Sequence, residues 1–256
     1  TSITPGFRIE HIRTESQGTY KYFPNPVDES NFTFESDDRS LPRTFVLLGV
    51  GVSHELTPKT ELYWNFSQNY RSVTFSDIRV TNPSFIIDED IKDENGFTTD
   101  VGFRGKWKNL ISYDLGAYSM MYQDRIGIVF DNRANRVRTN IGDALIYGLE
   151  IFADWNMVQS LGLDNQRFRL RWFINGALTG SKYINAIEGN NNVEGNQVEF
   201  IPQVNLKTGI NAGHKNLLTS LQWTRMSKQF TDAQNSPKTD DMDARAGVIG
   251  EIPAYQ

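Results

Sequence analysis

The sequence of 256 residues contains no cysteine. This absence excludes a disulfide framework, thiolate zinc sites and cysteine nucleophiles, and it leaves the redox compartment open. Histidine is scarce as well, because the chain holds only His11, His54 and His214, and their spacing matches no histidine metal motif. The composition therefore gives no support to a resident metal, and we predict that the protein has no cofactor.

Long hydrophobic runs and an excess of positive charge are also missing. The mean hydropathy is -0.48, and no run approaches the roughly 18 apolar residues of a membrane-spanning helix. The 26 Lys and Arg residues face 31 Asp and Glu residues, for a net charge of -5. Nucleic acid is therefore not an expected partner. Membrane β-barrels stay possible, because their strands alternate apolar and polar residues and average out as hydrophilic.

No arrangement of residues predicts an enzyme. A Ser/His/Asp hydrolase would have to recruit one of the scattered histidines, and no G-x-S-x-G turn presents a serine. Acidic residues gather at Asp88, Glu89 and Asp90, but this run lacks the register of a calcium loop. We interpret the run as a solvated acidic loop.

Aromatic residues are plentiful at 12% of the chain, and they occur beside 20 glycines. This composition is typical of β-sheet proteins. Apolar and polar residues alternate, so that Leu62, Trp64 and Phe66 share one face of a strand. The same plan recurs in four hairpins, which pair segments 43–54 with 61–72, 96–107 with 110–123, 144–155 with 167–180, and 199–212 with 217–230. We expect antiparallel strands and almost no helix.

The connections between these strands alternate in length. Turns within most hairpins are short, whereas the links 15–42, 72–95, 123–140, 181–197 and 229–251 are long and polar. Short turns at one end and long loops at the other are typical of outer-membrane β-barrels. We therefore predict an all-β, antiparallel up-and-down transmembrane barrel fragment of roughly ten strands. The alternative is a soluble β-sandwich with these aromatic side chains in its core.

A barrel would sort the residues of each strand between lipid and lumen, because one side of the pleat must be apolar across the hydrocarbon. The prediction places six side chains toward lipid: Tyr147, Leu149, Ile151, Phe168, Leu170 and Trp172. It places three toward the lumen: Glu150, Arg169 and Arg171.

Several segments resemble one family. Residues 122–126 (YQDRI), 140–144 (NIGDA) and 147–150 (YGLE) are similar to the "Y-x-D-x-I … N-x-G-x-A-x-x-x-G-x-E" signature of TonB-dependent outer-membrane receptors. Residues 4–10 (TPGFRIE), 199–202 (EFIP) and 250–255 (GEIPAY) are similar to other strands of that family. Residues 70–78 (YRSVTFSDI) resemble its ferric dicitrate branch. In order and spacing, the resemblance covers nearly the whole chain.

The resemblance implies a receptor in the outer membrane of a Gram-negative bacterium that imports ferric citrate or another ferric chelate. Residues 1–256 would form the later half of its barrel, without the plug domain and the closing strands. The implied partners are a small nutrient ligand, outer-membrane lipid and lipopolysaccharide, and TonB through the plug. A glycan importer of the same family is the alternative, with aromatic side chains stacking on sugars.

Arginines supply the candidate ligand-binding residues of this otherwise acidic chain. Guanidinium groups match carboxylates bidentately, and an anionic ferric chelate presents several carboxylates. We predict ligand contacts for Arg71, Arg79, Arg133, Arg136 and Arg138. The alternative is that these arginines bind lipopolysaccharide phosphates or remain in solvent.

Overall fold

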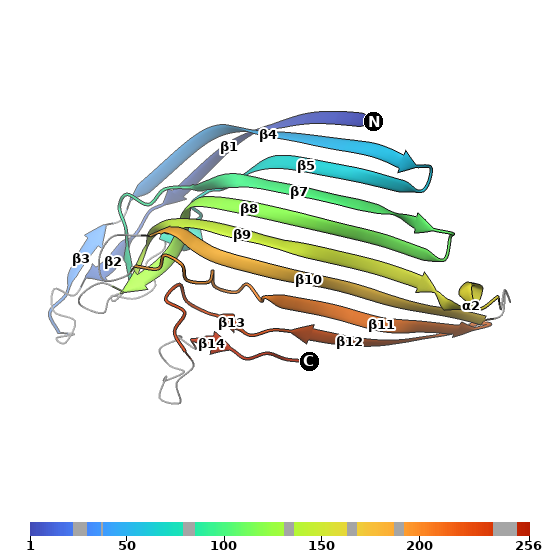
Figure 1. Ribbon diagram of the computed structural model, residues 1–256. Coiled ribbons are helices and arrows are strands. Elements are labelled where there is room, and N and C mark those ends of the chain that lie inside the picture. Colours follow the sequence, from blue (N-terminus) through green and yellow to red (C-terminus); the bar gives the residue numbers. More distant parts are fainter. Residues whose placement is uncertain are drawn as a thin grey trace.

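A computed structural model describes residues 1–22, 30–36, 38–78, 85–130, 136–162, 168–186, 192–237 and 250–256 (Figure 1). Its strands are β1 Ser2–Ser16, β2 Thr19–Tyr22, β3 Thr33–Ser36, β4 Arg39–Thr57, β5 Thr60–Arg71, β6 Phe85–Ile87, β7 Glu94–Trp107, β8 Ile111–Phe130, β9 Arg136–Asn156, β10 Phe168–Ala186, β11 Val204–His214, β12 Leu217–Met226, β13 Gln229–Phe230 and β14 Glu251–Ile252. The helices α1 Phe75–Ile78 and α2 Met157–Ser160 are short. Among the described residues, no helix has the length and apolar character to cross a bilayer.

The long strands form one ten-stranded sheet in the order β1-β4-β5-β7-β8-β9-β10-β11-β12, and the small strand β6 adds to β9. Neighbours along this order are antiparallel, whereas β6 runs parallel to β9. The sheet curves, and its first and last strands do not meet (Figure 1). The predicted antiparallel architecture with very little helix is confirmed.

Some strand bounds differ from the prediction. β8 and β9 continue past the predicted residues 123 and 144, because they keep pairing until Phe130 and Arg136. The predicted strand 199–212 begins only at Val204, since Glu199 turns away to bind Arg125 and Tyr183. The predicted strand 217–230 ends at Met226.

One face of the sheet, here called the outer face, is apolar. Leu62 pairs with Phe103, Phe103 with Leu115, and Leu115 with Ile151. Directly paired residues of antiparallel strands point to the same side, so these side chains form one continuous row. Leu149 on this face is 59% exposed. The segment from Tyr147 to Trp155 of β9 has the length of a membrane-spanning strand, which needs about 9 to 11 residues.

The six side chains predicted to face lipid all belong to the outer face. Tyr147, Leu149 and Ile151 alternate along β9, and Trp172 of β10 pairs with Trp155 on the same side. Phe168 and Leu170 continue this side of β10 toward its short-turn end. The residues next to them in sequence point to the opposite side of the sheet, here called the inner face. They are Glu150, Arg169 and Arg171, as predicted.

The inner face is more polar, and aromatic rings cover its glycines. The Tyr63 ring lies over Gly102, where an added Cβ would come within 2.5 Å of the tyrosine hydroxyl. The hydroxyl of Tyr118 lies in the same way 2.8 Å from the position of a Cβ on Gly148. Glycine is required at both positions because a larger side chain would displace the ring.

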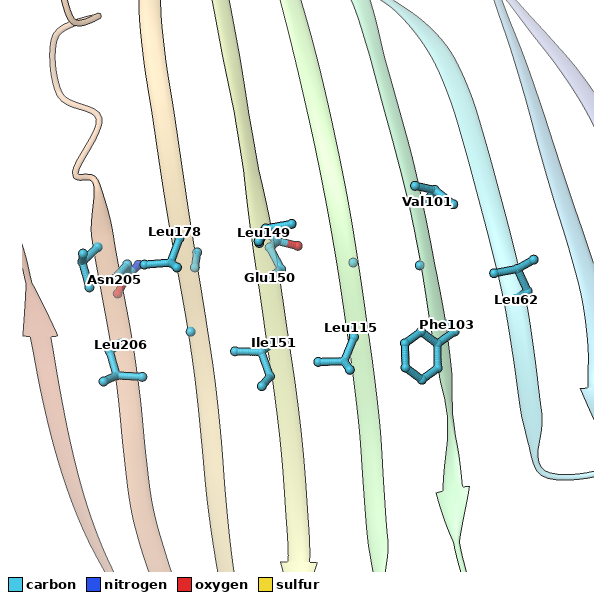
Figure 2. Close-up of a pocket in the computed structure, with 15 residues that line it drawn as sticks. Leu62, Val101, Phe103, Leu115, Leu149, Glu150, Ile151, Leu178, Asn205 and Leu206 are labelled. Carbon is cyan, nitrogen blue, oxygen red and sulfur yellow. The ribbon is translucent and has the colours of Figure 1, made fainter.

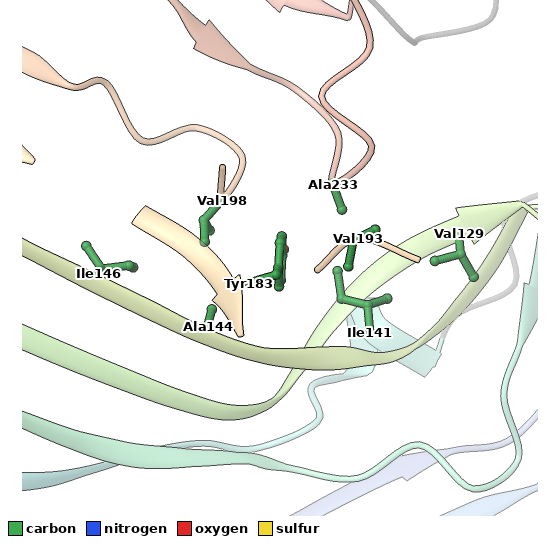
Figure 3. Packing of buried hydrophobic residues seen from close by; sticks show 8 residues of the cluster. All are labelled: Val129, Ile141, Ala144, Ile146, Tyr183, Val193, Val198 and Ala233. Carbon is green, nitrogen blue, oxygen red and sulfur yellow. The ribbon is translucent and has the colours of Figure 1, made fainter. Parts of the chain in front are cut away.

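Buried hydrophobic side chains occur at the end of the sheet where the long loops lie. One cluster joins β8, β9 and β10 to the loop before β11 and the segment after β12 (Figure 3). A second cluster joins the link between β5 and β7 to Leu41 and Ile126. The loops therefore fold onto the inner face, and they, not the apolar outer face, supply the packed core of the described residues.

Candidate functional site

The candidate site lies on the inner face at the long-loop end. Two loops cover this region: the first loop comprises the described residues 72–78 and 85–93, and the second loop comprises residues 192–203. Val73 and Ile78 of the first loop are buried, and so are Val193 and Val198 of the second. Their burial on the sheet positions the polar groups between the two loops.

A β-bulge in β8 and β9 lies beneath both loops. The register shifts on both sides of Arg125, and Asp124 has a positive φ of 54°. Opposite Arg125, Gly142 has a φ of 135°, which side chains rarely allow. The Asp124 amide donates to Asp143 Oδ1 at 3.0 Å, and Asn140 Nδ2 donates to the Asp124 carbonyl. The family-like motif at 122–126 and 140–144 thus builds this bulge.

The same motif holds the first loop. Asn140 Oδ1 accepts from the Lys92 amide at 2.7 Å, and Asn140 Nδ2 donates to the Lys92 carbonyl at 2.9 Å. Upstream, β6 pairs with β9, and the Asp88 amide donates to the Arg138 carbonyl at 2.9 Å. The first loop is therefore fastened along β9 by the Asn140 side chain and by backbone hydrogen bonds.

Two of the predicted arginines meet on one carboxylate. Arg71 Nη2 donates to both oxygens of Asp77, at 2.9 and 3.0 Å, and Arg71 Nη1 donates to Glu94 Oε1 at 2.9 Å. Arg138, from β9, donates from Nη1 to Asp77 Oδ1 at 2.8 Å. The Arg71 side chain keeps 43% of its surface exposed, whereas that of Asp77 is 1% exposed.

Asp77 is a buried carboxylate whose charge is well satisfied. Besides the arginines, the Thr74 amide and the Thr74 hydroxyl donate to Asp77 Oδ2, at 2.9 and 2.7 Å. Burial alone would raise the pKa of Asp77, but the Thr74 hydrogen bonds and Arg71 outweigh it, so the pKa is lowered. Asp77 therefore stays ionised at neutral pH and holds both guanidinium groups.

A second group of charged residues, formed by Arg43 and Asp93, was not predicted from the sequence. Arg43 Nε lies 2.6 Å from Asp93 Oδ2, and Arg43 Nη2 donates to the Val73 carbonyl at 2.8 Å. Tyr70 donates to the same carboxylate, and burial together with this bond raises the pKa of Tyr70 to about 12. No local pattern indicates this group, because Arg43 and Asp93 are brought together only by the pairing of distant strands.

A third group joins the bulge to the second loop. Arg125 Nη2 lies 3.2 Å from Glu199 Oε1, and the Tyr183 hydroxyl donates to Glu199 Oε2 at 2.6 Å. Burial, reinforced by the negative charge of Glu199, raises the pKa of Tyr183. Burial would lower the pKa of Arg125, but Glu199 raises it, so the guanidinium stays charged.

The structure places the predicted arginines unequally. Arg71 and Arg138 converge on Asp77. Arg136 begins β9, and its side chain is not described. Arg79 and Arg133 lie outside the described residues. The arginines that are brought together are thus already balanced by carboxylates, which the sequence prediction did not include.

A hollow of about 610 Å³ lies on the other side of the sheet. Figure 2 shows its apolar lining, which includes Leu62, Val101, Phe103, Leu115, Leu149, Ile151, Leu178 and Leu206. Because these side chains belong to the outer face, the hollow is separate from the polar groups beneath the loops. In the described part of the chain, no group of His, Cys, Asp and Glu side chains could hold a metal ion.

Comparison with protein families adds the decisive observation. The sequence matches the TonB-dependent-receptor-like β-barrel over residues 1–256. The chain belongs to this family. TonB-dependent receptors are transport receptors of the Gram-negative outer membrane, so the strands belong to a barrel of that membrane. Because the chain belongs to this family, the alternative of a soluble β-sandwich is wrong. The comparison with curated proteins finds no match.

Solved structures of transporters and an uptake receptor share the fold. The ferric citrate transporter FecA in its unliganded form has a TM-score of 0.65 at 22% identity, over 99% of this chain and 33% of that one. The ferric yersiniabactin receptor FyuA from Yersinia pestis has a TM-score of 0.63 at 17% identity, over 91% and 32%. The copper transporter OprC has a TM-score of 0.66 at 16% identity, over 90% and 33%. The chain thus spans about a third of each of these structures.

Proposed function

We propose that the chain forms the later part of the barrel of a TonB-dependent receptor that imports a ferric chelate. The observation that carries the proposal is the family match over residues 1–256, joined to loops that fold over arginines on the inner face. The plug domain, the closing strands and the contact with TonB belong to the rest of the complete receptor. In this proposal the chain's own task is to bind and admit the ligand, without a catalytic step.

The proposed ligand contacts are the arginines of the first loop and β9. Arg71 offers an exposed guanidinium beside Asp77, and Arg138 reaches the same carboxylate from β9. The number of arginines in the cluster of Arg43, Arg71 and Arg138 equals the number of carboxylates that they bind. A ligand carboxylate would therefore compete with Asp77 for the arginines. Further positive charge at the long-loop end of the barrel, here called the mouth, would come from Arg79, Arg133 and Arg136.

The long-loop end would be extracellular in this proposal, because outer-membrane barrels have long extracellular loops. Lipopolysaccharide would then surround this end and phospholipid the short-turn end. Glycan import is the second candidate, and one observation favours it. The hairpin of β2 and β3 exposes Tyr22 and Phe34, the latter by 68% of its surface, and exposed aromatic rings can stack on sugars.

The test is a binding titration of the purified complete receptor with ferric citrate as the probe. We expect Arg71→Ala or Arg136→Ala to weaken binding by about tenfold or more, because each lost charge-assisted contact would cost about 1.5 to 3 kcal/mol. Arg104→Ala is the matched control, since Arg104 is an ion-paired arginine of the same inner face at the opposite end. Unaltered affinity in both variants would contradict the proposed contacts between these arginines and the ligand. Tight binding of a neutral oligosaccharide would favour the glycan alternative.

A further inference from the structure

The two loops share one point of attachment, in addition to the hydrogen bonds that hold each loop separately. Both rest on the bulge in β8 and β9, and neighbouring residues of β8 hold them there: Ile126 holds the end of the first loop, and Arg125 holds the second. In the sheet, β8 and β9 lie between the strands that the two loops connect. The first loop connects β5 and β7, and the second loop connects β10 and β11. One contact from each loop thus meets at the dipeptide of Arg125 and Ile126.

The first loop reaches the anchor through Glu94. This residue begins β7 directly after the loop, and its side chain is 5% exposed. Glu94 Oε1 accepts from the Ile126 amide at 2.9 Å and from Arg71 Nη1 at 2.9 Å. Arg71 in turn binds Asp77 in the first loop. Displacement of the first loop would therefore remove the support of the Ile126 backbone.

The second loop reaches the anchor through Glu199. Arg125 Nη2 and the Tyr183 hydroxyl hold its two carboxylate oxygens. Two backbone hydrogen bonds, from the Tyr183 amide to Asn196 and from the Gly195 amide to Tyr183, both 2.9 Å long, fasten the loop further to β10. Arg125 Nε is buried and has no hydrogen-bond partner among the described residues. Such a partly satisfied buried group weakens its own site, so the joint with the second loop is poised to open.

We propose that the Arg125 and Ile126 dipeptide couples the two loops, so that they open and close as one cooperative unit. Consecutive residues of a strand at a bulge cannot move independently, because Asp124 and Gly142 fix the backbone in an unusual conformation on either side. Release of Glu94 shifts Ile126, and that shift moves Arg125 away from Glu199. By reciprocity, loosening the second loop loosens the first to the same degree. The mouth thus has one open and one closed state.

The test is native-state hydrogen exchange on the complete, unliganded receptor over a range of denaturant concentrations. The amides of Asp77 and Ile91 report on the first loop, and those of Gly195 and Asn196 report on the second, because each donates to a backbone carbonyl. The proposal predicts one common dependence on denaturant for all of them. Separate dependences for the two loops would overturn it, and this measurement needs no variant.

Variants then locate the coupling. Ile78→Ala empties a fully buried position of the first loop and should speed exchange in both loops by about tenfold or more. Val46→Ala, on the exposed outer face of β4, should leave both loops unchanged. In the Arg125→Met/Glu199→Gln background, which removes the joint without leaving a buried charge, Ile78→Ala should speed exchange in the first loop alone. Faster exchange confined to the first loop in the otherwise native receptor would contradict the coupling.

Discussion

The two ends of the sheet are built differently, although the same strands run through both. At the long-loop end, loops fold onto the inner face and bury side chains such as Ile78, Ile141 and Val198. Toward the short-turn end, inner-face residues such as Phe152 and Asn175 are exposed. The protein therefore packs its own core where the loops lie, whereas the apolar side chains of the outer face remain exposed.

The pair of β5 and β7 shows the same difference between the two ends. β5 and β7 are joined by Arg71 and Glu94 at the long-loop end and by Arg104 and Glu61 at the other, both with a nitrogen-oxygen distance of 2.9 Å. Arg104 and Glu61 are 56% and 30% exposed, whereas Glu94 is 5% exposed and shares Arg71 with buried Asp77. Equal distances thus conceal unequal energies, because exposed ion pairs contribute little and buried charges cost much when a partner is lost.

The largest effect is expected from removing a carboxylate at the long-loop end. Asp77→Ala should lower the free energy of opening the first loop by about 3 kcal/mol or more, because it leaves two guanidinium groups without their shared partner. Glu61→Ala, the matched change at the short-turn end, should cost less than about 1 kcal/mol. Hydrogen exchange of the flanking amides measures both. Equal effects would show that the two ends do not differ.

The next largest effect is expected on the apolar outer face. Ile151→Arg should destabilise the complete receptor by about 2 to 4 kcal/mol in bilayers, because Ile151 lies in the middle of the apolar band. Leu170→Arg, near the short-turn end of β10, should cost only about 0 to 1 kcal/mol. Asn175→Arg, on the inner face, is the control for charge alone. Folding equilibria in lipid vesicles measure these differences, and a flat profile would argue against a membrane-spanning band.

A smaller effect is expected from one hydrogen bond beneath the second loop. Tyr183→Phe removes the hydroxyl that donates to Glu199 and should weaken protection of the second loop by about 1.5 to 3 kcal/mol, the range for bonds to charged groups. Tyr118→Phe is a control, since its hydroxyl contacts a neutral Thr179 hydroxyl. An equal loss of protection in both variants would contradict a special role for Glu199.

The smallest effect near neutrality is that of pH. The folded pKa of Asp77 is lowered, so its stabilisation is fully present above its unfolded pKa of about 3.9 and is lost as the pH falls through the folded value. We expect no loosening of the first loop between about pH 8 and 5, and loosening below about pH 4. Hydrogen exchange of the first-loop amides, corrected for the intrinsic exchange rate at each pH, measures this change. Asp77→Asn should remove the pH dependence, and a dependence that persists would assign it to another group.

Much of the fold could be predicted from the sequence, because alternation along each strand decides which residues share the apolar face. Leu62, Trp64 and Phe66 show this pattern without any tertiary information. The arrangement of the mouth could not be predicted in the same way. Arg71 and Arg138 meet at Asp77 only because β6 and the first loop pack along β9. The residues of the 122–126 motif were recognised, but their role as the anchor of both loops needs the bulge geometry.

Cysteine scanning along β9 can show whether this strand crosses the membrane with one apolar and one polar face, and it is practical because the chain contains no native cysteine. Single cysteines at positions 137 to 155 of the complete receptor, in a background without other cysteines, would carry spin labels in lipid vesicles. Between Tyr147 and Trp155 we expect successive labels to be accessible alternately to lipid-soluble oxygen and to a water-soluble reagent. Labels at Ile141 and Ala144, buried beneath the loops, should be protected from both. Uniform access of the water-soluble reagent along the strand would contradict the account.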